Sequence, residues 1–275
     1  MSDVPVCPRH PDRESWVRCQ RCERPACPQC QRPAAVGVQC VDCVAEAAKG
    51  VRQPRSTFGG VLRSRDTVVT KVLIGACLVM FAGRYVLPSS VYDWLPLVNG
   101  YYANAFGPGT WWQPLTSAFL HGSPLHLLLN MYALWITGQY LEPLLGRVRF
   151  VALYVLSALG GAVGGLLLPF TANSSLVGAS GAIFGLFAAL LVVNRQLGRQ
   201  TGQIAALIVV NFLVGVFVAG ISWQAHLGGL VTGALVATAL ARGRRGRRAV
   251  QWAGTGAVAV VVLALLAYAA TRSPF

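Results

Sequence analysis

Apolar stretches long enough to cross a bilayer as helices fill the chain from residue 67 onward, whereas residues 1–66 are mostly polar. A transmembrane helix needs about 20 predominantly apolar residues. The pattern predicts seven spans, at residues 67–87, 119–140, 150–170, 176–194, 204–220, 223–241 and 250–270. Glycines recur four residues apart within spans three, four and six, a spacing that lets helix backbones pack closely. We therefore expect an all-α polytopic membrane protein with a tight helix bundle, preceded by a small polar domain.

Composition and charge extend this picture to topology. Of the 275 residues, 55% are hydrophobic and 12% are charged, whereas soluble domains have about 25% charged residues. The chain opens without the apolar core of a signal peptide, so we expect a cytoplasmic N-terminus. Of the 14 Lys and Arg residues from Ser56 onward, 12 then fall on the cytoplasmic side, as the positive-inside rule requires. This predicts a multi-pass protein of the cell membrane.

Two basic stretches flank the predicted bundle. Residues 48–66 form a basic linker with four arginines, and residues 242–275 hold a basic loop followed by the seventh span. Because the linker adjoins the first span and no basic groove with interleaved aromatic residues accompanies it, we expect contact with the bilayer surface and no nucleic-acid partner. The run from Arg242 to Arg248 is interpreted as a solvated stop between spans six and seven.

Residues 1–47 contain four pairs of metal-ligand residues, and two residues separate the members of each pair. That spacing lets both side chains of a tight turn reach one tetrahedral zinc ion. Disulfides are disfavoured because the cytoplasm is reducing. The pairs are used either consecutively or interleaved, which their spacing alone leaves open. The predicted ligands of two structural zinc ions are Cys7, His10, Cys19, Cys22, Cys27, Cys30, Cys40 and Cys43.

The same segment resembles B-box-type zinc fingers in its Cys-x2-His opening and its closely spaced Cys-x2-Cys pairs. The resemblance implies interleaved sites, one made of Cys7, His10, Cys27 and Cys30 and the other of Cys19, Cys22, Cys40 and Cys43. Both sites are closed, with no open position for catalysis. We therefore expect a structural role and a cytoplasmic protein partner.

Polar residues of the predicted spans gather at one depth. Ser180 lies a few residues into span four and His226 a few residues into span six, both just after external loops. His126 and Asn130 lie in the first turns of span two, and His121 marks its external start. Polar side chains in hydrocarbon are costly and are presumed functional. We expect these five residues to form one site that opens to the external side.

The residue types at this depth predict nucleophilic catalysis. Serine becomes a nucleophile when a neighbouring base takes its proton, and histidine is the commonest base. Ser180 and His226 fill these roles. No Asp or Glu follows Glu142, so we expect a Ser–His dyad without a carboxylate. Phe184 lies four residues after Ser180, on the same helical face, and is placed to stack on the imidazole.

Acyl transfer also needs hydrogen-bond donors for the developing oxyanion. His126 and Asn130 are four residues apart, so one helix face presents both side chains. The backbone N–H of Ser180 is the expected third donor if Gly178 opens the start of span four.

The motifs around these residues resemble the rhomboid family of intramembrane serine proteases. The resemblance rests on Gly178-Ala179-Ser180-Gly181, on Ala225-His226-Leu227-Gly228-Gly229 and on the segment from His121 to Asn130, and it covers residues 67–241. It implies a six-helix catalytic core, to which a seventh helix is added. By position it implies Ser180 as nucleophile, His226 as base, Asn130 and His126 at the oxyanion, His121 in support and Glu142 as an anchor at the end of span two.

Family members cleave other membrane proteins within or near a transmembrane segment, so the resemblance implies transmembrane protein substrates. Two departures stand out: Trp112 is followed by Gln113 where the family often has Arg, and Phe184 stands where many members have Tyr. Neither removes a catalytic group. The alternative is a catalytically silent rhomboid-like scaffold that binds client proteins. A transporter is disfavoured because the chain lacks paired interrupted helices in repeated halves.

Overall fold

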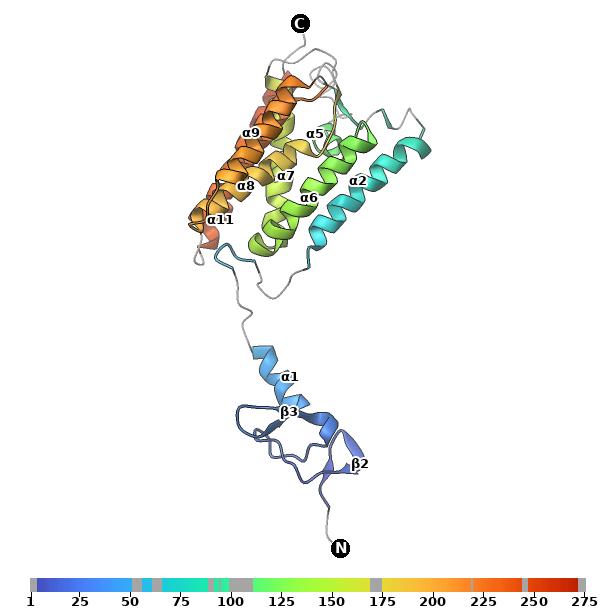
Figure 1. Ribbon diagram of the computed structural model, residues 1–275, viewed down its shortest axis with the longest axis vertical. Helices are drawn as coiled ribbons and strands as arrows, with labels where there is room; N and C mark the ends of the chain where they lie inside the picture. Colours follow the sequence, from blue (N-terminus) through green and yellow to red (C-terminus); the bar gives the residue numbers. More distant parts are fainter. Residues whose placement is uncertain are drawn as a thin grey trace. The chain divides into compact units, whose positions relative to one another are not determined.

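The structure, a computed structural model, describes residues 4–50, 56–60, 66–88, 92–93, 95–98, 111–168, 175–218, 220–243 and 247–271. The chain separates into two compact units, Met1–Gln53 and Pro54–Phe275 (Figure 1). The four arginines of the predicted linker and the middle of the run between Arg242 and Arg248 lie outside the described residues.

The first unit is built from short strands, one 3-10 turn and one helix. Strands β1 and β2 form one antiparallel pair, and β3 and β4 form another. The elements are β1 (Val6–Cys7), β2 (His10–Glu14), η1 (Pro28–Cys30), β3 (Gln31–Pro33), β4 (Val38–Cys40) and α1 (Val41–Gly50). Six of its seven fully buried core side chains are cysteines, the other being Ala26. Apolar packing alone is therefore a weak source of stability for this unit.

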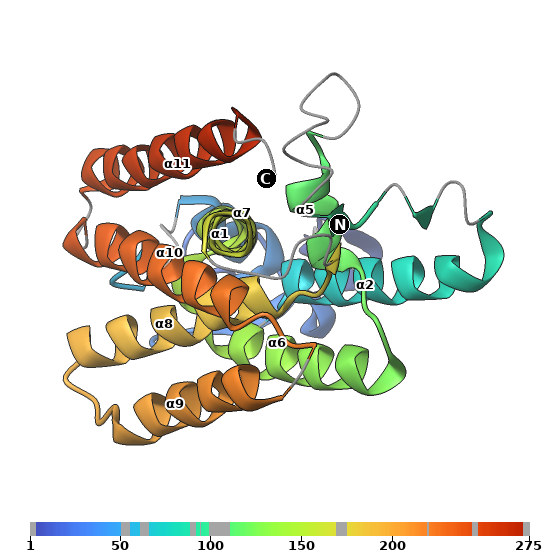
Figure 2. The same cartoon turned by 90° about the horizontal axis from the view of Figure 1, so that it is seen from above.

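The second unit is a bundle of long helices. In the described residues, seven helices have 16 residues or more, close to the seven predicted spans. Its elements are α2 (Val68–Val86), β5 (Leu97–Val98), α5 (Gln113–Thr116), η2 (Ser117–Phe119), α6 (Pro124–Leu145), α7 (Arg147–Leu167), β6 (Ser175–Leu176), α8 (Ser180–Gln196), α9 (Gly202–Phe217), α10 (Trp223–Arg242) and α11 (Arg248–Thr271). Figure 2 shows α10 between α8 and α11, with α9 beyond α8.

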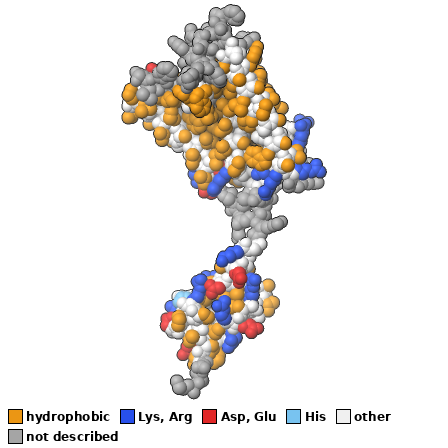
Figure 3. Space-filling view, turned by 180° about the vertical axis from the view of Figure 1, so that it is seen from behind, with side chains coloured by type: hydrophobic (Ala, Val, Ile, Leu, Met, Phe, Trp, Pro, Cys, Tyr) orange, Lys and Arg blue, Asp and Glu red, His pale blue; other side chains and the backbone are white. Residues whose placement is uncertain are grey.

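The outer surface of the bundle is apolar. Among the described residues, α2, α7, α10 and α11 are each long and apolar enough to cross a membrane, while α8 and α9 are apolar but shorter. Large apolar side chains point outward, Val79, Leu128, Phe217 and Val260 among them. Figure 3 shows hydrophobic side chains over one flank, with Lys and Arg gathered at one end. Because soluble proteins rarely expose such continuous apolar surfaces, the bundle is suited to a bilayer.

Helices α7, α8 and α10 form the centre of the bundle, and glycines set their separation. A Cβ on Gly229 of α10 would lie 1.9 Å from the carbonyl oxygen of Gly181 of α8, and one on Gly233 would lie 2.3 Å from the Cα of Gly185. On the other side of α10, a Cβ on Gly228 would lie 2.2 Å from the carbonyl oxygen of Gly160 of α7. The glycine spacing in the sequence therefore marks backbone-to-backbone contacts.

We expect Gly229→Ala to lower the free energy of unfolding by at least about 1–3 kcal/mol, the usual range for overpacking. The added methyl group meets a backbone carbonyl, which has no rotamer to move to. The measurement is the thermal unfolding midpoint of the purified protein in detergent. Gly75→Ala is the control, because a Cβ at Gly75 meets nothing within 4 Å; equal midpoints for the two variants would contradict this packing.

Two helices begin later than the predicted spans. Helix α6 starts at Pro124 and not at 119, because Ser123 caps the helix by accepting a hydrogen bond from the His126 N–H (3.2 Å). Proline suits this first helical position because a backbone N–H there would have no partner within the helix. Helix α8 starts at Ser180 and not at 176, because residues 175 and 176 form β6, which pairs with β5. The serine is therefore the first residue of its helix.

The opposite end of α6 is joined to α2. The Glu142 carboxylate, only 2% exposed, accepts hydrogen bonds from the backbone N–H groups of Val69 (3.0 Å) and Thr70 (2.8 Å) and from the Thr70 hydroxyl (2.7 Å). These N–H groups belong to the first turn of α2, where an anionic acceptor is favourable. Glu142 thus fixes the start of α2 against the end of α6.

Residues 56–60, which the sequence assigns to the linker, pack on this same end of the bundle. Phe58 is fully buried, and both the Ser56 hydroxyl and the Gly60 N–H donate to the carbonyl oxygen of Leu144 in α6. Nearby, Arg149 Nε of α7 donates to Gln251 Oε1 of α11 (2.9 Å). The segment that follows the first unit is therefore part of the bundle, and α1 extends to Gly50, beyond the predicted boundary at 47.

Candidate active site

Ser180 sits at the N-terminus of α8 because of the turn before it. Gly178 has φ +129°, a conformation that L side chains rarely adopt, and its N–H donates to the Ser117 carbonyl oxygen (2.9 Å). This turn ends the extended segment and starts the helix. As the first helical residue, Ser180 has a backbone N–H without an intrahelical partner. Gly178 therefore forms the turn that precedes Ser180, and the role of the Ser180 N–H as a third oxyanion donor stays a prediction.

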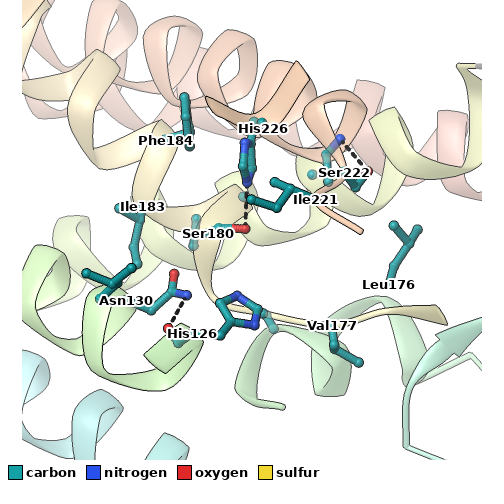
Figure 4. A pocket seen from close by; sticks show the side chains of 18 of the residues that line it. His126, Asn130, Leu176, Val177, Ser180, Ile183, Phe184, Ile221, Ser222 and His226 are labelled. Carbon is teal, nitrogen blue, oxygen red and sulfur yellow. Dashed lines mark hydrogen bonds between the residues drawn. The ribbon is translucent and has the colours of Figure 1, made fainter. Parts of the chain in front are cut away.

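Ser180 and His226 are in hydrogen-bond contact (Figure 4). Their Oγ and Nε2 atoms are 2.9 Å apart, across the interface of α8 and α10. Helix α10 begins three residues before the histidine, at Trp223, where Ser222 caps it by accepting from the Ala225 N–H (3.2 Å). The two helix starts therefore place these side chains at the same end of the bundle.

The imidazole of His226 is held between two helices. It stacks on Phe184 of α8 with ring centroids 4.2 Å apart and an interplanar angle of 12°. On its other edge, a Cβ at Gly215 of α9 would lie 2.8 Å from Nδ1. No described residue hydrogen-bonds Nδ1. Packing against Phe184 and Gly215, and not a carboxylate, therefore orients this ring within the described part of the chain.

His126 and Asn130 approach the serine from α6. A Cβ on Gly178 would lie 2.8 Å from His126 Nε2 and 3.7 Å from Ser180 Oγ, so the histidine ring covers the glycine beside the serine. Asn130 donates from Nδ2 to the His126 carbonyl oxygen (2.8 Å), which leaves one amide hydrogen free to point elsewhere. In Figure 4 both side chains lie near Ser180, on the opposite side from His226.

These side chains line a cavity of about 580 Å³ between α6, α8, α9 and α10. Six of the predicted site residues line it, namely Ser180, His226, His126, Asn130, Gly178 and Phe184. Its walls are otherwise mostly apolar, with Leu129 and Ile183 among them. A mostly apolar cavity with a few convergent polar groups is typical of a substrate site.

His121 lies behind this cavity and does not line it. Its ring meets the His126 ring edge to face, with centroids 5.1 Å apart. The side chain is 1% exposed. Among the predicted site residues, His121 therefore contacts His126 and lies outside the cavity that Ser180 lines.

The first unit gathers its eight predicted ligands into two groups, Cys7, His10, Cys27 and Cys30 in one and Cys19, Cys22, Cys40 and Cys43 in the other. The ligand atoms of each group lie within 4.8 Å of one another. The grouping is the interleaved one that the B-box resemblance implies. All eight cysteines of the chain are free thiols.

Distances within the groups suit a tetrahedral metal ion. His10 Nδ1 lies 3.3 Å from Cys27 Sγ and 3.4 Å from Cys30 Sγ, and the Sγ atoms of Cys22 and Cys40 are 3.7 Å apart. The edges of a zinc tetrahedron with sulfur and nitrogen ligands are about 3.5–3.8 Å. The backbone N–H of Cys27 is the largest of several groups that lower the pKa of Cys7, to about 6, whereas burial and the neighbouring thiols raise the pKa of Cys30 in the same group to about 11. The thiolate, which is the form that binds metal, is therefore favoured at Cys7 and disfavoured at Cys30, and the ligand distances are the support for a metal site.

Two residues that shape the site were not predicted from the sequence. Gly215 packs against His226, and Ser117 holds the turn at Gly178 through its backbone carbonyl. A glycine within an apolar helix was a weak sequence signal for the role of Gly215. The role of Ser117 left no signal in the pattern of side chains, because its contact is made by the backbone carbonyl.

Comparison with known proteins identifies similar chains. The family model for the Rhomboid domain matches residues 108–243. The chain is 34% identical over 176 residues to "Putative rhomboid protease YdcA" of Bacillus subtilis, covering 62% of this chain and 86% of that protein. It is 30% identical over 194 residues to "Rhomboid protease GluP" of the same organism, covering 68% of this chain and 38% of GluP. It is also 30% identical over 158 residues to "Rhomboid protease AarA" of Providencia stuartii, covering 48% of this chain and 56% of AarA.

Proposed function

Because this chain belongs to the rhomboid family, a family of multi-pass membrane proteins, we propose that it is an intramembrane serine endopeptidase that cuts transmembrane segments of other membrane proteins. The observation that carries the proposal is the 2.9 Å contact between Ser180 Oγ and His226 Nε2, two residues that line a mostly apolar cavity. The relatives named as proteases support it at the level of the family.

In the first half of the reaction, Ser180 Oγ attacks the scissile carbonyl carbon while His226 Nε2 takes its proton. The peptide C–N bond then breaks, and His226 gives the proton to the departing amine. This requires the neutral tautomer with hydrogen on Nδ1, so that Nε2 accepts from the serine. The product is an ester between Ser180 and the new carboxyl end of the substrate.

The oxyanion that forms during attack is assigned to donors on both sides of the serine. Ser180, Asn130 and His126, which carry the candidate donors, all line the cavity, and the side chains of Asn130 and His126 lie near Ser180 (Figure 4). Donors aimed at developing charge in a water-poor site contribute much of an enzyme's rate enhancement. Phe184 keeps the His226 ring in the plane that the proton transfer needs.

We assign the catalytic end of the bundle to the external side and the N-terminus to the cytoplasm. Support comes from described basic residues at the opposite end, among them Lys71, Arg147, Arg149, Arg195, Arg199, Arg242, Arg247 and Arg248. They lie at the starts of α2, α7 and α11 and at the ends of α8 and α10. Arg84, at the end of α2, lies on the catalytic side. A surplus of Lys and Arg on one side marks the cytoplasmic face.

The two Cys/His groups of the first unit are proposed to hold one structural zinc ion each, with four protein ligands and no open position. When bound, zinc supplies folding stability to a unit whose core is made of its own ligands. We further propose that this unit binds a cytoplasmic protein. Deleting residues 1–47 is expected to change cleavage, abundance or interactions in cells; no change in any of the three would refute that role.

The rival function is a silent scaffold that binds membrane proteins without cutting them. The two functions separate in liposomes that contain the purified protein and a model transmembrane substrate. A protease yields two fragments with a new terminus near the external face, whereas a scaffold co-purifies with intact substrate. Intact substrate in the presence of correctly folded protein would refute the proposed function.

A further inference from the structure

Helix α9 carries an amide side chain in the middle of its apolar sequence. Its polar side chains are Gln203, in the first turn, and Asn211, near the centre of the helix. Asn211 lines the catalytic cavity together with Val214, Gly215 and Val218 of the same helix. These four positions follow the spacing i, i+3, i+4 and i+7, so they form one face of α9, and Asn211 is its polar member. A polar side chain within hydrocarbon is costly and is presumed functional.

The depth of Asn211 follows from its place in the helix. Gly215, four residues later, packs against the His226 ring. Asn211 therefore lies one helical turn, about 5.4 Å, further from the catalytic end of the bundle than that contact. It is six positions before the end of α9, and Asn130 is six positions after the start of α6. The two amides thus lie at similar depths on two walls of the cavity.

The Asn211 amide is only half satisfied within its own helix. Its Nδ2 donates to the Leu207 carbonyl oxygen (2.8 Å), which holds the side chain in place. One amide hydrogen and the Oδ1 acceptor remain, and no described residue hydrogen-bonds Oδ1. The residue is half-buried and borders the cavity. Oδ1 is therefore a preorganised acceptor for a molecule that enters the cavity.

A peptide segment in this cavity brings backbone groups that need partners. Ser180 reaches a carbonyl carbon only where the substrate helix is unwound, and unwinding releases N–H and C=O groups from their bonds within the helix. Unpaired backbone groups are costly in hydrocarbon. Besides the two amides, the cavity-lining side chains at this depth are apolar, Leu129, Ala133 and Phe187 among them. Because Asn130 is already assigned to the oxyanion, Asn211 is the acceptor that remains for the rest of the segment.

We propose that Asn211 is a substrate-binding residue whose Oδ1 accepts a hydrogen bond from a backbone N–H of the unwound substrate segment. The inference rests on the proposed function, because it names a binding contact of the same reaction. One helical turn of depth corresponds to about two residues of extended chain, at about 3.3 Å each. The contacted N–H therefore belongs to a residue about two positions from the scissile bond, toward the membrane interior. Asn211 touches the substrate away from the reacting atoms and transfers no proton.

Asn211→Leu tests this contact in the full-length protein in liposomes with the model transmembrane substrate. Leucine is close to asparagine in size and favours a helix, so the fold should be retained. We expect kcat/KM to fall about tenfold, the effect of one lost hydrogen bond. A fluorophosphonate should label Ser180 at nearly the wild-type rate, because this small reagent needs only the dyad. Val210→Leu is the matched control: Val210 is exposed and lies outside the described lining of the cavity, so kcat/KM should stay at the wild-type value.

A synthetic substrate in which one backbone N–H is replaced by an ester oxygen locates the contact. Each such ester removes a single donor and leaves the side chains unchanged. With the wild-type protein, an ester about two residues from the scissile bond, on the interior side, should lower kcat/KM about tenfold. With Asn211→Leu the same ester should have no further effect, because the acceptor is already gone. Asn211→Gln keeps an amide on a longer side chain and should restore part of the dependence on that N–H.

The outcomes distinguish a binding role of Asn211 from a structural one. If kcat/KM were unchanged in Asn211→Leu, or if esters at every position acted equally on the wild-type protein and on Asn211→Leu, the proposal would be overturned. Equal losses of labelling and cleavage in Asn211→Leu would show that Asn211 only supports the fold, which also overturns it. A wild-type protein that neither takes the label nor cuts the all-amide substrate would overturn the proposed function itself.

Discussion

Replacing Ser180 with alanine is expected to lower kcat for a transmembrane substrate by roughly 10⁴-fold or more, the usual cost of removing an activated nucleophile. His226→Ala should cost about as much, because the serine keeps its proton without a base. The double variant is expected to be no slower than either single variant, since the two side chains act as one unit. The measurement is single-turnover cleavage in liposomes at saturating substrate.

Ser157→Ala is the matched control for this experiment. Ser157 is a fully buried serine of α7, its hydroxyl has no hydrogen-bond partner among the described residues, and it packs over Gly185 of α8. Removing that hydroxyl should leave cleavage near the wild-type rate. If the fold losses in kcat of the two single variants multiplied in the Ser180→Ala/His226→Ala double variant, the two residues would not act as a dyad. A Ser180→Ala variant that cleaved as fast as Ser157→Ala would also contradict the dyad.

Replacing Cys27 with alanine is expected to unfold the first unit and leave the bundle intact. Structural zinc contributes about 10 kcal/mol or more to folding, and the unit has little buried apolar surface besides its cysteines. Zinc content should fall from two ions per chain to one or none, and residues 4–50 should become sensitive to protease. The measurements are metal analysis and limited proteolysis of the full-length protein.

Cys77→Ala provides the control, because Cys77 is buried in α2, outside both ligand groups. That variant should keep both zinc ions. A Cys27→Ala chain that also kept two ions would refute the assignment of ligands. Removing metal with a chelator should reproduce the effect of Cys27→Ala on the first unit, since the ligands and the ion stabilise each other.

Periodic features of the sequence were the most predictable. Long apolar runs identified helices, and glycines four residues apart marked the close contacts of α7, α8 and α10. The expected meeting of Ser180 with His226, and the stacking of Phe184, follow from depth and helical spacing. A sequence displays helical spacing directly, and the common depth of Ser180 and His226 follows from counting residues from the ends of their spans.

Features that depend on distant backbone atoms were not predictable. The start of α8 at Ser180 needs the contact between Gly178 and the Ser117 carbonyl, 61 positions earlier. Residues 56–60 look like linker because their described contacts with the bundle come from one serine hydroxyl, one backbone N–H and one phenylalanine. The position of Gly215 against His226 depends on how α9 packs on α10. None of these contacts produces a periodic pattern in the sequence, because each joins segments that are distant along the chain and meet only in the folded bundle.

We propose that Ser180 is an activated nucleophile in a membrane-embedded site. The most direct measurement is to treat the purified protein in liposomes with a fluorophosphonate and to locate the adduct by peptide mass spectrometry. We expect one adduct, on Ser180, that disappears in Ser180→Ala and is strongly reduced in His226→Ala. Labelling that persisted in Ser180→Ala, or a folded wild-type protein without any adduct, would contradict it.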